Sequence, residues 1–115
     1  MVTVPADARA GAIFAALADD TRRTILATIS QRPSATATEL SEVVPVTRQA
    51  VAKHLGVLRD AGLIEAERVG RETRYHTRSG ALRPAAAWIA DSDASWTSQL
   101  ERLKHQAPSA PSKDR

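Results

Sequence analysis

The sequence predicts a single, mainly helical domain that carries one small β-hairpin. Its 115 residues suffice for one hydrophobic core of ordinary size. Apolar residues recur at helical spacing in five segments, and capping residues precede several of them. Two short runs with strand composition lie between the fourth and fifth segments and are joined through a glycine. We expect the domain to span residues 7–105 and the Pro/Ser-rich residues 106–115 to form a disordered tail.

The first two helices are expected at about residues 7–18 and 21–30. Asp19 or Asp20 can cap the second helix, and residues 31–34 (QRPS) break the helical pattern after it. The apolar residues at helical spacing are Ile13, Phe14 and Leu17 in the first helix and Ile25, Leu26 and Ile29 in the second.

A capping box predicts the third helix, at about residues 37–43. The Thr36 hydroxyl and the Glu39 carboxylate can each accept a hydrogen bond from a backbone N–H that would otherwise lack a partner. Leu40 supplies a buried residue, and Pro45 ends the helix.

The fourth helix, at about residues 48–61, follows after the short connection that is typical of helix-turn-helix units. Thr47 is the expected cap, and Gly62 is the expected left-handed residue after the last turn. Spacing at 100° per residue separates two faces. The inner face carries Val51, Leu55 and Leu58, and the outer face carries Gln49, Ala52, Lys53 and Gly56.

The outer face of this helix predicts contact with the major groove of DNA. Ala52 and Gly56 are small and let the helix backbone approach a groove about 12 Å wide. Arginine can bind guanine and glutamine can bind adenine, and both residue types stand in the first turn. The expected DNA contacts are Thr47, Arg48, Gln49, Ala52 and Lys53, with Thr36 and Thr38 near phosphate at the start of the third helix. A solvated amphipathic helix is the alternative. His54 is expected to be packed or to lie at the groove edge.

Residues 63–68 and 73–77 predict a two-stranded hairpin, a wing, directly after the helix-turn-helix. Arg68, Arg71 and Arg74 lie at or beside its tip, where they could contact phosphates or enter a minor groove. A basic turn that only protects a sheet edge is the alternative.

The last helix is expected to reach about residue 105, with Pro84 in or near its first turn. Its tryptophans and leucines exceed what a domain of this size hides internally, so a shared homodimer interface is expected. The residues expected there are Ile13, Phe14, Leu17, Trp88, Ile89, Trp96, Leu100 and Leu103. Burial of both tryptophans in the domain core is the alternative.

Charge and composition agree with a nucleic-acid partner. Residues 48–78 hold seven Arg or Lys against four Asp or Glu, so the positive excess lies on the expected DNA-reading unit. The chain has no cysteine and no long apolar run, which predicts no thiolate site, no membrane partner and a cytoplasmic protein. No cofactor is expected, and the three histidines lie in different elements, so an enzyme is disfavoured.

In four stretches the chain resembles winged-helix regulators of the ArsR (SmtB/ArsR-type) family. They are ALADDTRRTIL at 16–26, TATELSEVVPVTRQAVAKHLGVLRDAGLI at 36–64, VGRETRYH at 69–76 and AAAWIADSDASWTSQLERL at 85–103. Asp20 stands where a proline is common in the family. The resemblance implies a homodimer that uses the first and last helices, a palindromic operator, and repression relieved by an effector. It places the chain among the members that lack metal-binding motifs.

Two other functions remain open from the residues alone. One is a winged helix that contacts proteins and has no operator. The other is a sensor whose metal or small-molecule site is formed by Asp91, Asp93 and His105 on the last helix.

Overall fold

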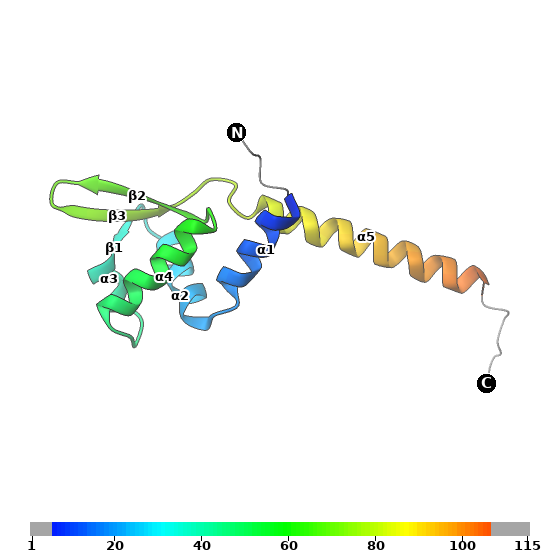
Figure 1. Cartoon of the computed structure of the whole chain (residues 1–115), viewed down its shortest axis with the longest axis horizontal. Coiled ribbons are helices and arrows are strands. Elements are labelled where there is room, and N and C mark those ends of the chain that lie inside the picture. Colours follow the sequence, from blue (N-terminus) through cyan, green and yellow to red (C-terminus); the bar gives the residue numbers. More distant parts are fainter. Residues whose placement is uncertain (1–5, 107–115) are drawn as a thin grey trace.

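A computed structural model describes residues 6–106 of the protein. Five helices and one three-stranded sheet make up this part of the chain (Figure 1). In chain order they are α1 (Ala6–Leu17), α2 (Asp20–Ser30), β1 (Ala35–Thr36), α3 (Ala37–Ser41), α4 (Arg48–Asp60), β2 (Ile64–Val69), β3 (Glu72–Thr77) and α5 (Arg83–Gln106). The mainly helical fold with a β wing is confirmed. The expected tail falls almost entirely outside the described residues.

Side-chain caps set where the central helices begin. The Asp19 carboxylate accepts a hydrogen bond from the Arg22 backbone N–H at 2.9 Å and so caps α2. The Thr47 hydroxyl accepts from the Ala50 backbone N–H at 3.1 Å and caps α4. After α4, Gly62 adopts φ 79°, a conformation that side chains with a Cβ rarely take. Local hydrogen bonds therefore fix where α2 and α4 begin, and Gly62 marks where α4 ends.

The sheet contains one strand more than the sequence predicts. The expected hairpin is present as β2 and β3, joined by a two-residue turn at Gly70 and Arg71. In addition, β1 pairs antiparallel with the other edge of β3, which gives the order β1-β3-β2. Because β1 is only two residues long, the sequence shows no alternating pattern by which it could be recognised as a strand. β1 pairs with β3 of the wing and runs directly into α3. Strand pairing therefore links the wing to the helix-turn-helix.

The core lies between α1, α2, α4 and the base of the sheet. Ile25, Ile29, Leu40, Leu55 and Leu58 are all at most 1% exposed. Ile13 also lies in this core, only 1% exposed, instead of on the dimer surface expected from the sequence. Leu17 is partly buried against the same cluster. The side of α1 that carries Ile13 therefore packs on the core of its own protomer.

Helix α5 begins against α1 and then extends away from the rest of the domain (Figure 1). The chain therefore measures 69 Å in its longest dimension and only 21 Å in its shortest. Near the base of α5, Phe14 and Trp88 pack edge to face with ring centroids 5.6 Å apart. Beyond this contact the apolar side chains are uncovered, and Trp96 is 61% exposed. Within residues 6–106, no helix is both long and apolar enough to cross a membrane.

Candidate nucleic-acid interface

A groove of about 710 Å³ separates the helix-turn-helix from the wing. Arg48, Gln49 and Ala52 of α4 line one wall, and Arg68 and Arg71 of the wing line the other. The remaining lining residues are Thr36, Ala37, Thr38, Glu39, Glu72, Thr73 and Tyr75. The fold thus brings most of the expected DNA contacts to one concave surface. Glu72, Thr73 and Tyr75 were not expected there, because sequence spacing did not show which side of β3 faces the helices.

Helix α4 is oriented as its periodicity predicts. Val51, Leu55 and Leu58 are buried, whereas Gln49, Ala52, Lys53 and Gly56 are exposed. A Cβ added to Gly56 would meet no heavy atom within 4 Å, so nothing inside the protomer requires a glycine. A larger side chain at this position would therefore point away from the protomer.

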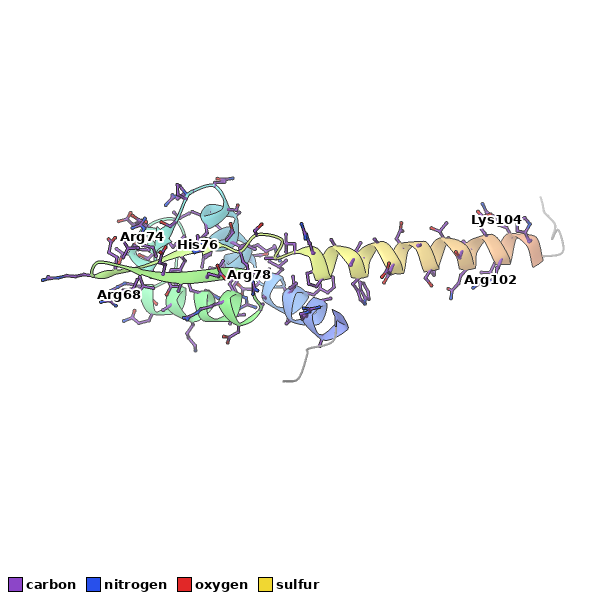
Figure 2. All side chains as sticks on the ribbon, turned by 90° about the horizontal axis from the view of Figure 1, so that it is seen from above. Arg68, Arg74, His76, Arg78, Arg102 and Lys104 are labelled. Atoms are coloured by element: carbon purple, nitrogen blue, oxygen red, sulfur yellow. The ribbon has the colours of Figure 1, made fainter. Side chains whose placement is uncertain are left out.

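Two wing arginines remain available to a ligand. Arg68 and Arg71 are exposed, and Arg68 lies toward the tip of the hairpin (Figure 2). The Arg68 Nε donates a hydrogen bond to the Gly70 carbonyl at 3.1 Å, which holds its stem along the turn. Gly70 itself takes φ 63° and forms the tight tip. This arrangement presents positive charge at the outer end of the groove.

Arg74, for which the sequence predicts DNA contact, is engaged by residues of its own protomer. Its side chain is 23% exposed, and its Nε donates to the Ser34 hydroxyl at 2.7 Å. The same guanidinium donates to the Glu72 and Glu39 carboxylates at 3.0 Å and 3.2 Å. Since these contacts lie within the protomer, Arg74 fastens β3 to the start of α3.

Thr36 is likewise engaged inside the protein. It is 9% exposed, and its hydroxyl accepts from the Glu39 backbone N–H at 3.1 Å. Glu39 completes the capping box by accepting from the Thr36 backbone N–H at 2.9 Å. That hydrogen bond is the main reason why the pKa of Glu39 lies below its usual value; desolvation raises the pKa in part, and the positive charge of Arg74 lowers it further. Of the two threonines, only Thr38 is exposed.

Arg22 is a positioning residue that the sequence patterns did not reveal. Its Nε donates to the Ala16 carbonyl at 2.7 Å, and its Nη2 donates to the Ala15 carbonyl at 3.2 Å. Its Nη1 lies 3.4 Å from Nδ1 of His54 on α4. One guanidinium therefore satisfies two of the last carbonyls of α1 and contacts α4. His54 is partly buried at this junction, in agreement with a packed histidine.

Within residues 6–106 of one protomer, no three His, Asp or Glu side chains come together in a way that could hold a metal ion. The two aspartates and the histidine considered on the last helix thus form no such group.

Comparison with known proteins agrees with this geometry. A family model described as a helix-turn-helix domain matches residues 17–67. The regulator YuzN of Bacillus subtilis (strain 168) is 48% identical over 66 residues, which cover 52% of this chain and 72% of YuzN. The regulator Rv2034 of Mycobacterium tuberculosis (strain ATCC 25618 / H37Rv) is 39% identical over 85 residues, 74% of this chain and 76% of Rv2034.

Solved structures extend the similarity to the whole fold. An ArsR-like transcriptional regulator from Rhodococcus sp. RHA1 superposes with a TM-score of 0.81 at 38% identity, covering 90% of this chain and 97% of that one. The ArsR family transcriptional regulator RHA00566 gives a TM-score of 0.72 at 30% identity, covering 85% and 98%. Together with the groove between recognition helix and wing, these relationships show a transcriptional regulator with a helix-turn-helix DNA-binding domain. The chain belongs to the ArsR family of winged helix-turn-helix regulators.

Proposed function

We propose that the protein is a homodimeric repressor that binds a palindromic operator. The observation that carries this proposal is the groove between α4 and the wing, which has basic residues on both walls. Each copy would place α4 in the major groove and the wing tip on the neighbouring phosphate strand. Arg48 and Gln49 would read base edges, Lys53 would contact phosphate or a second base, and Arg68 and Arg71 would contact phosphate.

The uncovered face of α5 supports self-association. Trp88, Ile89, Trp96, Leu100 and Leu103 are each at least 41% exposed and lie on one side of the helix. An apolar stripe of this length on a helix that leaves its own domain is typical of a protein interface. In a dimer with a two-fold axis, the same surface of each copy packs against the other. A second copy of the chain is therefore the partner that we propose for this stripe.

The spacing along α5 favours an antiparallel arrangement of the two copies. Ile89, Trp96 and Leu103 recur every seven residues, with Ser92 and Gln99 at the alternate positions of the seam. A hollow of about 420 Å³ lies beside Ser92, between Trp88 and Trp96. Antiparallel pairing that places Trp96 over the hollow of the second copy brings Trp96 opposite Ser92 and Ile89 opposite Gln99. Parallel pairing would instead stack tryptophan on tryptophan.

Footprinting of the DNA upstream of the gene with purified protein tests the proposal. We expect two protected half-sites about one helical turn apart. Arg48→Ala and Gln49→Ala should each cost about 1–3 kcal/mol at the base they read and should relax sequence preference. Arg102→Ala, which removes an exposed charge from the distal part of α5, is the matched control. Absence of protection would contradict operator binding, and wild-type behaviour of both α4 variants would contradict the assigned reading residues.

A further inference from the structure

A second concave site lies on the opposite side of α2 from the DNA-reading unit. Its volume is about 620 Å³, within the range of small-molecule sites. The walls are apolar and are formed mainly by Leu17, Leu26, Leu63, Leu82 and Ala86. No part of the proposed interaction with DNA uses this pocket.

The charged residues that line the pocket are all positive. Arg23, Arg78 and Arg83 belong to the lining, and no aspartate or glutamate does. Arg78 lies where the hairpin approaches the base of α5 (Figure 2). It faces the Glu65 carboxylate only at 4.0 Å, and both side chains are more than half exposed. Positive side chains therefore border an apolar surface in this pocket.

Gly80 helps to hold Arg83 at this site. The glycine adopts φ 70°, and the Arg83 Nε lies 3.2 Å from the point where a Cβ would stand. The arginine stem thus lies across the loop 78–82 because no side chain occupies that place. Arg23 is fixed differently, by donating to the Leu17 carbonyl and by pairing with Asp20.

The pocket also lies between two parts of the molecule. α2 and the ends of the wing strands form one side of it, whereas Leu82, Arg83 and Ala86 at the base of α5 form the other. A molecule bound between them would bias the angle at which α5, and with it a second copy, leaves the domain. This regulatory consequence depends on the proposed repressor function, but binding itself does not.

We infer that this pocket binds a small amphipathic carboxylate as the effector. The alkyl or aromatic part would lie among the leucines, and the carboxylate would accept charge-assisted hydrogen bonds from Arg83, with Arg78 adding positive charge.

Calorimetric titration of the full chain with octanoate, in the absence of DNA, tests the site. Octanol is the uncharged comparison with the same alkyl chain. Ala27→Phe fills the pocket from an exposed position on α2, and Arg83→Gln removes the charge while keeping the stem. We expect saturable binding of one octanoate per chain, loss of that binding in Ala27→Phe, and about tenfold or greater weakening in Arg83→Gln and with octanol. Arg102→Gln, outside the pocket, should bind octanoate normally.

Three results would overturn the inference. The first is equal affinity of the protein for octanol and octanoate, and the second is unchanged octanoate affinity in both pocket variants. The third is an octanoate affinity that falls as self-association rises, which would show that a second copy fills the pocket. Thermal unfolding of each variant establishes that it is folded. Operator binding is measured separately without octanoate, so failure of the ligand site and failure of the repressor proposal give different results.

Discussion

Arg74 on the wing donates a hydrogen bond to the Glu39 carboxylate that closes the N-terminal cap of α3. One acidic side chain thereby joins the helix-turn-helix to the wing. The contact explains why an arginine that looks like a DNA ligand in the sequence is used inside the protein. It also separates the wing arginines into two classes that experiments can distinguish.

Arg71→Gln should affect DNA binding, whereas Arg74→Gln should mainly affect the stability of the fold. Arg71 lies exposed in the turn, so its loss should weaken binding to all DNA sequences and lower the salt dependence by about one counterion. Arg74→Gln removes hydrogen bonds within the protomer and should lower the free energy of unfolding by about 1–2 kcal/mol with little change in salt dependence. Binding isotherms at several salt concentrations and urea unfolding measure both effects. Equal salt slopes for the two variants would contradict this division.

Stability should fall in acid partly through Glu39. Its folded-state pKa is lowered, mainly by the backbone hydrogen bond from Thr36, so the carboxylate stabilises the fold above the ordinary value of 4.5. That contribution is lost as the pH falls through the folded-state pKa. Glu39→Gln cannot ionise, so the stability difference from wild type should be largest near neutral pH and shrink below pH 4.5.

Urea unfolding between pH 7 and pH 3 measures this difference. Glu101→Gln, at an exposed pair with Lys104 on α5, is the control for the loss of a surface carboxylate. A constant difference between Glu39→Gln and wild type across this range would show that the carboxylate charge contributes nothing.

Gly56→Ala should stabilise the free protein. A Cβ at this position has open space around it, and alanine favours a helix over glycine by about 1 kcal/mol. Gly56→Met should keep much of that gain and yet lose operator affinity, because its side chain would stand between α4 and the groove floor. Thermal unfolding and operator titration of the two variants check these outcomes. Full affinity in Gly56→Met would show that this face of α4 does not meet DNA.

Ser92→Trp should disrupt self-association. The new side chain would occupy the hollow between Trp88 and Trp96, and overpacking costs about 1–3 kcal/mol. Ala94→Trp adds the same group on another, exposed face of α5 and should leave association unchanged. Sedimentation equilibrium over a range of concentrations provides the measurement. If Ser92→Trp associates like wild type, the seam lies elsewhere.

Local chemistry explains which features could be predicted from the sequence. The caps at Thr36 and Thr47, the glycine stop at Gly62 and the inner face of α4 depend on residues a few positions apart, so their patterns are visible in one dimension. The strand β1 and the placement of Arg74 depend on pairing across roughly 40 residues, which spacing does not encode. The sequence predicts Ile13 at the dimer interface, whereas the structure buries it in the protomer core. Periodicity shows that a helix has an apolar face, but it does not show which partner covers that face.

The strand β1 has a further consequence for how the domain moves. Thr36 pairs with Arg74 in the sheet, and the Arg74 side chain donates to Glu39 of α3, so the wing cannot separate from the helix-turn-helix without breaking both contacts. The backbone amides of β3 and of the first turn of α3 should therefore exchange their hydrogens as one cooperative unit. Phosphate contact at the wing tip would then slow hydrogen exchange at the start of α3, which makes the amide of Glu39 a reporter of events at the far end of the hairpin.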